Sequence, residues 1–210
     1  MNQTAETAVR WTRRKEARPA EILDAALKVF AEKGYAGARM DDIARAAGVT
    51  KGTIYLYFDG KEAVFKSLVR ESIGATLTGM DETQKTFHGP AKTLLRFALT
   101  TIAQLLASGE RAVLPKIILG ESGNFPELAR FWRSEIIDRG IARLSAIVER
   151  GIAQGEFRKV PVEHVVRLCI APLLLSAIWR STFAQFDAVP FDYQGLLETH
   201  LDVLFRGLEP

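Results

Sequence analysis

Apolar residues recur along most of the chain at intervals of three and four positions, and alternating apolar and polar runs are absent. Spacing of this kind places apolar side chains along one face of a helix. Glycine and proline mark breaks between the periodic segments, as at Gly34, Gly48 and Pro190. The pattern predicts an all-α fold of about nine helices, at roughly 19–33, 40–47, 51–57, 61–77, 91–107, 111–119, 126–153, 162–185 and 192–207.

The predicted helices fall into two groups that differ in charge. Residues 1–70 contain 13 Lys and Arg against 9 Asp and Glu, whereas residues 71–210 contain 15 against 16. A positive excess favours contact with a polyanion, although an excess of this size is also compatible with ordinary solvation. We therefore expect a compact head over 18–70 and a larger helical body over 71–210, joined by the helix that begins near Lys61.

Residues 1–17 precede the first periodic segment and have no apolar face. They carry the positive charges of Arg10, Arg13, Arg14 and Lys15. We expect a flexible basic arm of the kind that follows phosphates or enters a minor groove of DNA. A solvated tail with no partner has the same composition, and this alternative stays open.

Composition excludes several classes of protein. With 48% hydrophobic and 25% charged residues among 210, the chain has enough apolar surface for a core and does not resemble a disordered chain. The single cysteine, Cys169, cannot form an internal disulfide and indicates a reducing compartment. The longest uncharged apolar run, 168–179, has 12 residues, against the roughly 20 of a membrane span. We expect a cytoplasmic protein with no signal peptide and no membrane partner.

Two of the predicted helices, 40–47 and 51–57, are short and meet at Gly48. Helical spacing turns Ile43 of the first and Ile54 of the second toward a shared interior. Glycine adopts the positive φ that a tight turn between helices requires. This arrangement predicts a helix-turn-helix, in which the second helix enters the major groove of DNA. The alternative is a pair of short core helices without a partner.

The first turn of the second short helix suits a negatively charged partner. Thr50 is placed as the N-cap, and the free amides that follow it favour a phosphate, together with the helix dipole. Gly52 has no side chain to hold the backbone away from DNA. The residues that we expect to face DNA here are Thr50, Lys51, Gly52, Thr53, Tyr55, Tyr57 and, at the start of the next helix, Lys61.

The residues around this turn form a longer motif: Ile22-Leu23-Asp24-Ala25-Ala26, Phe30, Lys33-Gly34-Tyr35, Met40-Asp41-Asp42-Ile43-Ala44, Gly48-Val49-Thr50-Lys51-Gly52-Thr53-Ile54-Tyr55, Tyr57-Phe58 and Lys61-Glu62. The stretch that contains them, Ala20 to Phe65, resembles the DNA-binding head of the TetR family of transcriptional regulators. The resemblance implies an all-helical homodimer that binds a palindromic operator, usually as a ligand-released repressor, with DNA contacts at the seven residues above. The family usually has Ser or Thr where this chain has Ala38 and Arg39, and we expect Arg39 to contact phosphate instead.

The segment over 165–179 is apolar nearly all round, which is unusual for a helix at a protein surface. Such a helix needs cover on two sides, and a second copy of the chain is one natural cover. A buried central helix in a monomer is the alternative. Together with the final helix, the segment predicts a dimer interface at Leu174, Ile178, Leu197, Leu201, Leu204 and Phe205.

Pro172 interrupts the hydrogen bonding of that helix and predicts a kink, which leaves room for a cavity. Aromatic residues are frequent in the body, as expected for a mostly apolar ligand pocket. The candidate lining residues are Leu94, Phe97, Ile118, Phe125, Trp132, Leu175 and Trp179, each of which could equally be an ordinary core residue.

The sequence gives little support for catalysis or for binding of a metal or cofactor. The three histidines lie far apart, and no phosphate-binding glycine loop or catalytic nucleophile motif is present. We therefore expect no enzyme activity, no metal and no cofactor. The sequence predicts a DNA-binding regulator that responds to a small molecule, with double-stranded DNA, an effector and a second copy of itself as partners. The alternative is an effector-independent nucleoid protein that uses the same head.

Overall fold

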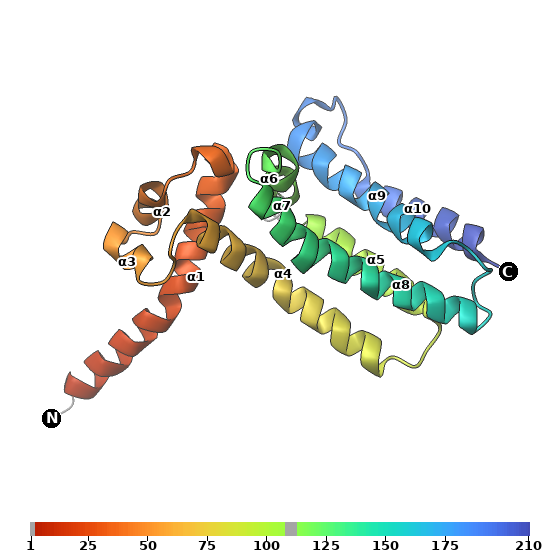
Figure 1. Cartoon of the computed structure of the whole chain (residues 1–210), viewed down its shortest axis with the longest axis horizontal. Coiled ribbons are helices and arrows are strands. Elements are labelled where there is room, and N and C mark those ends of the chain that lie inside the picture. The colour runs from red at the N-terminus through yellow and green to blue at the C-terminus, as the bar shows by residue number, and fades with distance from the viewer. Residues whose placement is uncertain (1–2, 108–112) are drawn as a thin grey trace. The chain divides into compact units, whose positions relative to one another are not determined.

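The computed structural model describes the backbone of residues 3–107 and 113–210, and the side chains of residues 19–74, 76–107 and 113–210. This part of the chain is helical and contains no strand, so the predicted all-α class is confirmed for it (Figure 1). The elements in order are α1 (Gln3–Gly37), α2 (Met40–Ala46), α3 (Lys51–Tyr55), α4 (Lys61–Thr86), α5 (Ala91–Ala107), α6 (Val113–Glu121), α7 (Pro126–Trp132), η2 (Arg133–Ile137), α8 (Asp138–Ala153), α9 (Val162–Thr182), η3 (Ala184–Phe186) and α10 (Tyr193–Leu208).

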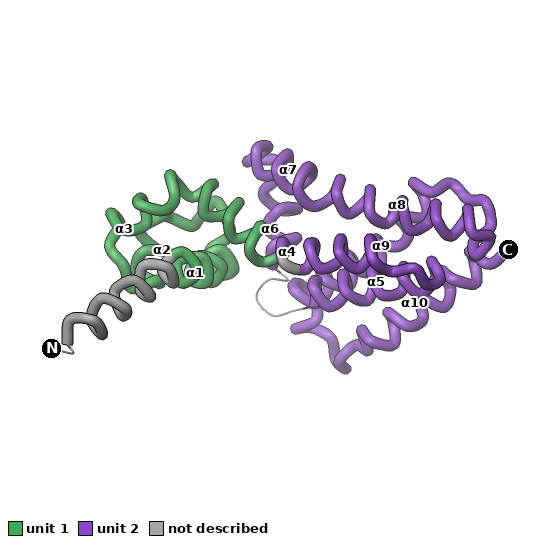
Figure 2. The backbone as a smooth tube through the Cα atoms, turned by 90° about the horizontal axis from the view of Figure 1, so that it is seen from below, with its two compact units in different colours: residues 1–72 green, residues 73–210 purple. Residues whose placement is uncertain are grey.

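The chain divides into two compact units, Met1–Ser72 and Ile73–Pro210 (Figure 2). The first unit holds α1, α2, α3 and the start of α4, and the second holds the rest of α4 and the later helices. We call these units the head and the body. The boundary expected from the sequence, between residues 70 and 71, lies beside the observed division.

Helix α1 begins well before its predicted start at Pro19. The segment over 1–17, expected as an arm, is helical from Gln3, with Pro19 inside the helix. Its Ala, Glu, Arg and Lys residues have high intrinsic helix propensity, which explains a helix without an apolar face. The side chains of the arm's basic residues lie outside the described part. At the predicted stop, Gly34, the backbone leaves the helical conformation with a φ of 68°, and only a short helical segment follows this break, up to Gly37.

Helix α4 does not end near Leu77 as the sequence predicts, but continues to Thr86. Tertiary contacts support the added turns: the Met80 side chain is buried, and Asp81 binds Arg143 of α8. Such contacts override the weak helix propensity of the local sequence.

The single helix predicted over 126–153 is interrupted in the structure. A π-helical turn, η2, separates α7 from α8. The Ser134 hydroxyl donates to the carbonyl of Phe131 at the start of this turn, 3.1 Å away. One extra residue in a helical turn changes the apolar spacing too little to be recognised from sequence.

The head is built on an aromatic cluster. The Phe30 ring lies 5.7 Å from that of Tyr35 and 5.5 Å from that of Phe65, measured between centroids. Around it, Ile43 of α2 and Ile54 of α3 are fully buried. Because the apolar faces of α2 and α3 are both used in this core, their polar faces are left for solvent or a partner.

The core of the body joins α5, α8, α9 and α10. Its fully buried members include Leu95, Leu99, Val148, Val166 and Leu201. Charged residues close the end of this bundle, where the Glu156 carboxylate accepts hydrogen bonds from the first amides of α5, those of Ala91 and Lys92, at 2.9 and 3.0 Å. A carboxylate at a helix N-terminus satisfies unpaired amides and complements the helix dipole.

Helix α9 is more apolar than the sequence analysis allowed for. By length and composition alone, Val162–Thr182 could cross a membrane, with a mean hydropathy of 1.6 over its most apolar window, of which 28% is buried. The uncharged run over 168–179 is only part of this helix, which also includes the flanking residues. Val166, Cys169 and Leu173 of α9 nevertheless pack in the body core, as in a core helix of a globular protein.

One ion pair in the body is mostly buried. Arg143 donates from Nε to Oδ1 and from Nη2 to Oδ2 of Asp81, the second at 2.8 Å, and its side chain is 10% exposed. Hydrogen bonding and charge from this guanidinium lower the pKa of Asp81. A carboxyl whose pKa falls on folding stabilises the fold above its unfolded pKa of about 3.9, and this contribution is lost as the pH falls through the folded pKa.

We expect Asp81→Asn to lower the free energy of unfolding by roughly 1–2 kcal/mol at pH 7, because Arg143 loses its charged partner. The difference from wild type should shrink as the pH is lowered below about 4, where Asp81 itself becomes protonated. Urea unfolding at several pH values measures both effects. Glu82→Gln is the control, because its pair with Lys85 is exposed and worth little. Equal losses in the two variants would contradict the assignment.

Candidate nucleic-acid interface and body cavities

Helices α2 and α3 are joined by a tight turn centred on Gly48. Its φ of 65° lies in the left-handed region that glycine favours. The turn is fixed by backbone hydrogen bonds, from the Val49 amide to the Ala44 carbonyl at 3.0 Å and from the Gly48 amide to the Arg45 carbonyl at 3.2 Å. The head therefore contains the predicted helix-turn-helix geometry.

The first turn of α3 is open to solvent. The Thr50 hydroxyl accepts a hydrogen bond from the Thr53 amide at 3.2 Å, which confirms Thr50 as the N-cap. Lys51 and Gly52 are exposed, and a Cβ added to Gly52 would meet only the Thr50 hydroxyl, at 3.9 Å. The missing Cβ thus leaves the Gly52 backbone open to close approach.

Lys51 is held by an acidic residue of α2. Its Nζ lies 3.0 Å from Oδ1 of Asp41, and hydrogen bonding and charge from Asp41 raise the pKa of Lys51. The two side chains are 59% and 55% exposed. An exposed pair of this kind is weak, so a phosphate can displace Asp41 at little cost, although the carboxylate still repels an approaching polyanion.

Arg39 precedes α2 and is exposed, as its predicted contact with phosphate requires. A guanidinium has no acceptor atom and cannot cap a helix as Ser or Thr does. The capping interaction runs the other way, from the Arg39 amide to the Asp42 carboxylate at 3.3 Å. Asp42 also binds Lys33 at 2.8 Å, and the Lys33 hydrogen bond lowers the pKa of Asp42.

The structure does not support Lys61 as a DNA-facing residue. Its Nζ donates to the carbonyls of Tyr35 and Ala36, at 2.6 and 3.3 Å, and lies 4.5 Å from the centroid of the Tyr35 ring. Lys61 thus donates hydrogen bonds to carbonyls at the end of α1, where a cation complements the helix dipole. The sequence could not show this, because the two segments are distant along the chain.

The outer surface near the end of α3 is partly apolar. Tyr55 is 45% exposed and Leu56 is 80% exposed, whereas Tyr57 is half-buried. The sequence analysis passed over Leu56, because leucine in a short helix is ordinarily a core residue. An exposed apolar side chain beside a recognition helix is suited to contact a thymine methyl group or sugar.

The seven residues proposed as a ligand pocket do not line one cavity. Leu94, Ile118 and Trp132 are buried, whereas Phe97 is 46% exposed. Phe125 lies at the N-cap of α7 and lines neither of the two spaces described below. Leu175 and Trp179 line an apolar groove of about 480 Å³ together with Pro172, Asp187, Val189, Phe191 and Leu196. Aromatic character alone therefore failed to separate pocket residues from the core.

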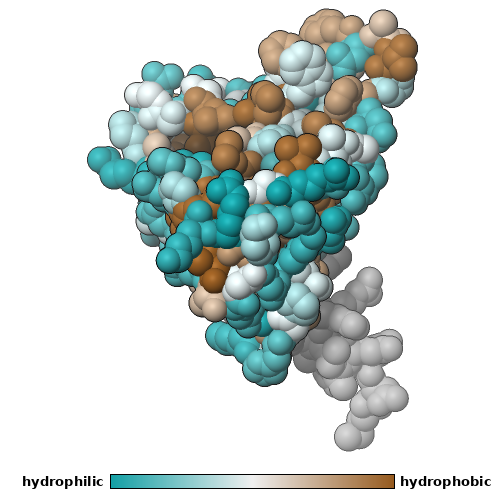
Figure 3. Space-filling view, turned by 90° about the vertical axis from the view of Figure 1, so that its right-hand side faces the viewer, coloured by the Kyte–Doolittle hydropathy of each residue, from teal (hydrophilic) through white to brown (hydrophobic). Residues whose placement is uncertain are grey.

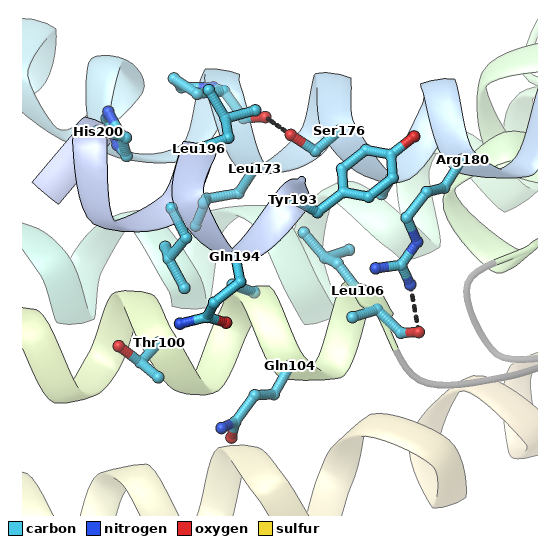
Figure 4. A pocket seen from close by; sticks show the side chains of 15 residues that line it. Thr100, Gln104, Leu106, Leu173, Ser176, Arg180, Tyr193, Gln194, Leu196 and His200 are labelled. Atoms are coloured by element: carbon cyan, nitrogen blue, oxygen red, sulfur yellow. Dashed lines mark hydrogen bonds between the residues drawn. The ribbon is translucent and has the colours of Figure 1, made fainter. Parts of the chain in front are cut away.

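A second cavity, of about 310 Å³, lies between α5, α9 and α10. Figure 4 shows Arg180 and Tyr193 side by side at one end and His200 at the other. Pro172 lines both the cavity and the groove. This agrees with the expectation that a proline within α9 leaves space beside it. Cys169 lines neither of these two spaces; it is buried, and burial raises the pKa of its thiol to about 12.

The predicted dimer interface needs correction. Leu197, Leu201 and Phe205 are buried in the core of the body, so they are not available to a partner. The other three predicted residues, Leu174, Ile178 and Leu204, are half-buried. Periodicity identified the apolar face of α10 but could not show that this face is used within the protomer.

The exposed apolar side chains of α9 form a stripe along one face. Leu168, Leu175 and Trp179 are 62%, 61% and 43% exposed, and intervals of seven and four residues align them on a helix. Val203 of α10 is 64% exposed, and the connection from α9 to α10 adds Phe186, Val189 and Phe191. Figure 3 shows apolar atoms gathered at the upper end of the molecule, where Figure 1 places that connection.

Two family models match the chain. Residues 22–68 match the model described as bacterial regulatory proteins of the tetR family. Residues 88–188 match the model described as a tetracyclin repressor-like C-terminal domain. The first match contains α2, α3 and the turn between them, and the second contains most of the body.

Known proteins resemble the chain over nearly its whole length. A fatty acid metabolism regulator protein of Bacillus subtilis is 34% identical over 197 residues, which cover 92% of this chain and 98% of the relative. The crystal structure of the transcriptional regulator FadR from Bacillus subtilis in complex with stearoyl-CoA has 28% identity and a TM-score of 0.70, over 90% of this chain and 99% of that one. The fatty acid degradation regulator FadR from Bacillus halodurans has 25% identity and a TM-score of 0.72, over 90% and 94%.

We expect Gly48→Ala to lower the free energy of unfolding by roughly 1–2 kcal/mol, because alanine is strained at the φ of this turn. Gly52→Ala is the matched control, since Gly52 lies in a helix and has room for a Cβ. Its stability should stay the same or rise by up to about 1 kcal/mol. Urea unfolding measures both. A stable Gly48→Ala variant would show that the turn does not require glycine.

Proposed function

Because the chain belongs to the TetR family of transcriptional regulators, we propose that it is a cytoplasmic, ligand-responsive repressor. In this proposal it binds a palindromic operator as a homodimer, and a small amphipathic effector releases it from DNA. The observation that carries the proposal is the solvent-open first turn of α3, capped by Thr50 and followed by Lys51 and Gly52.

The head supports insertion of α3 into the major groove. Its apolar residues face the core, while Lys51, Thr53 and Tyr55 offer groups to phosphates and base edges. Arg39 adds a positive charge at the start of α2, and Leu56 adds an apolar contact. Lys61 is left out of the proposed interface, because it binds carbonyls of α1.

The body supports association with a second copy through the stripe on α9 and the exposed Val203 of α10. Large side chains exposed in a row cost free energy in water and mark a contact surface. Two copies of the chain related by a twofold axis would present their α3 helices to two half-sites, which explains a palindromic operator.

The comparisons suggest the class of effector. The Bacillus subtilis FadR structure was determined with stearoyl-CoA, so a molecule with a fatty acyl chain is the first to test. Such a molecule can release the protein only if it prefers the body conformation that binds DNA less well. A preference of about 1–3 kcal/mol lowers operator affinity by roughly 5- to 150-fold.

Charge changes on the head test the DNA interface. We expect Lys51→Ala to weaken binding to a duplex selected from genomic fragments by about tenfold, through loss of a phosphate or base contact. Asp41→Asn should strengthen binding several-fold at low salt, because it removes a repulsive charge and frees Lys51. Fluorescence anisotropy at several salt concentrations measures both affinities.

Glu82→Gln is the matched control for Asp41→Asn, since it removes the same charge from an exposed pair with lysine in the body. We expect its DNA affinity to equal that of wild type. If Lys51→Ala bound DNA as wild type does, or if Glu82→Gln strengthened binding as much as Asp41→Asn, the proposed interface would be wrong.

A charge placed in the stripe tests the dimer. We expect Leu175→Glu to convert a dimer to monomers at micromolar concentration, because a carboxylate cannot be buried unpaired in an apolar contact. Leu119→Glu, at an equally exposed leucine of α6, should leave the dimer intact. Analytical ultracentrifugation distinguishes the two. A monomeric wild-type chain, or a dimeric Leu175→Glu variant, would argue against the stripe as the interface.

A further inference from the structure

We infer that the cavity between α5, α9 and α10 is the effector site, and that Arg180 and Tyr193 hold the carboxylate head of a fatty acid in it. The inference rests on the proposed function, which requires an effector but does not say where it binds. It replaces the pocket predicted from sequence, whose residues lie elsewhere.

A buried polar atom of Tyr193 supports this assignment. The Oη of Tyr193 is buried and has no hydrogen-bond partner among the described residues. A buried hydroxyl without a partner is costly, and a ligand that accepts its hydrogen bond removes that cost. In Figure 4 the ring of Tyr193 lies beside Arg180, with its hydroxyl directed toward α9 and the Arg180 guanidinium toward the carbonyl of Ala107.

The positive charge of Arg180 also supports an anionic ligand. The side chains that line the cavity include the guanidinium of Arg180 and no carboxylate. Arg180 donates to the Ala107 carbonyl and lies 5.3 Å from the centroid of the Tyr193 ring, which are both uncharged groups. Among the described residues, no carboxylate is paired with this partly buried guanidinium, and a planar carboxylate matches its geometry.

The neighbouring acidic residue fixes where the anionic head belongs. Asp187 lines the adjacent groove, where its Oδ2 accepts from the Trp179 indole at 3.1 Å, and it does not line the cavity. An anion in the groove would therefore meet a like charge, whereas one in the cavity meets Arg180. The carboxylate is accordingly assigned to the cavity side of Tyr193.

The remaining walls suit an acyl chain. Apolar side chains line the part of the cavity between α9 and α10, among them Leu173, Ala177, Leu196 and Leu197, whereas Thr100, Gln104, Gln194 and His200 add polar groups elsewhere on the walls. A cavity of about 310 Å³ has room for several methylene groups beside a carboxylate. The site therefore fits a carboxylate with a chain of medium length, such as decanoate.

The position of the cavity also links ligand binding to the proposed dimer. Leu173, Ser176, Ala177 and Arg180 of α9 line the cavity, whereas Leu168, Leu175 and Trp179 of the same helix form the exposed stripe. A ligand that separates α9 from α5 therefore changes the position of the helix that contacts the second copy.

The test measures binding of decanoate to the full chain by isothermal titration calorimetry. We expect saturable binding by wild type, weakened at least tenfold in Arg180→Gln and severalfold in Tyr193→Phe, because each loses a hydrogen bond to a charged group. Arg167→Gln is the matched control, since Arg167 is an exposed arginine of the same helix that pairs with Glu163. Thermal unfolding verifies that each variant is folded.

Two further ligands identify the head group. Decanol, which lacks the carboxylate, should bind far more weakly than decanoate to wild type. Decanoyl-CoA distinguishes a thioester from a free acid as the source of the acyl chain, and binding of the thioester alone would overturn the carboxylate assignment. Equal affinity of wild type, Arg180→Gln and Tyr193→Phe for decanoate would overturn the site itself.

Operator binding by the ligand-free chain is measured in parallel, and its absence would contradict the proposed function without bearing on the cavity.

Discussion

The turn at Gly48 determines what the head can present to a partner. Since α2 has seven residues and α3 has five, neither helix is stable alone, and each depends on packing against the other, with α2 also packed against α1. That packing requires a sharp change of direction within the four residues between the helices, which the positive φ of Gly48 permits. With Ile43 and Ile54 fixed in the core, the opposite face of α3 carries Lys51, Gly52 and Tyr55. The exposure of the proposed DNA face thus follows from the turn.

The head could be predicted in detail because its signals are local. A glycine between two short apolar patterns, a threonine three residues before its amide partner, and a glycine stop at Gly34 each act within a few residues. Lys61 shows the limit of such reasoning. Its role depends on carbonyls of Tyr35 and Ala36, and a pairing between distant segments leaves no periodic trace in the sequence.

The helices of the body could be predicted from the sequence, but not which face of each helix is buried and which is exposed. Helix α9 is apolar all round, so periodicity cannot say which side meets α5 and α8 and which side is exposed. The structure resolves this by burying Val166, Cys169 and Leu173 and exposing Leu175. Helix α10 has a single apolar face, which periodicity identifies as a contact surface without naming the partner. The structure shows that this face packs in the core of the protomer. The cavity was hardest to foresee, since its polar residues, Arg180 and Tyr193, come from different helices.

Helix α9 lines the cavity with one side and carries the exposed apolar stripe on another. This arrangement has an energetic consequence for the proposed regulation. A ligand shifts a conformational equilibrium only by the difference between its affinities for the two states. A ligand held entirely within a rigid part of the body would have no such difference. The cavity instead lies between α5, which belongs to the core, and the two helices that carry exposed apolar side chains. Its volume therefore depends on where α9 and α10 lie relative to α5, and in the proposed dimer the same displacement would alter the surface offered to a second copy. Arg180 strengthens this dependence, because a guanidinium and a carboxylate interact well only over a narrow range of separations.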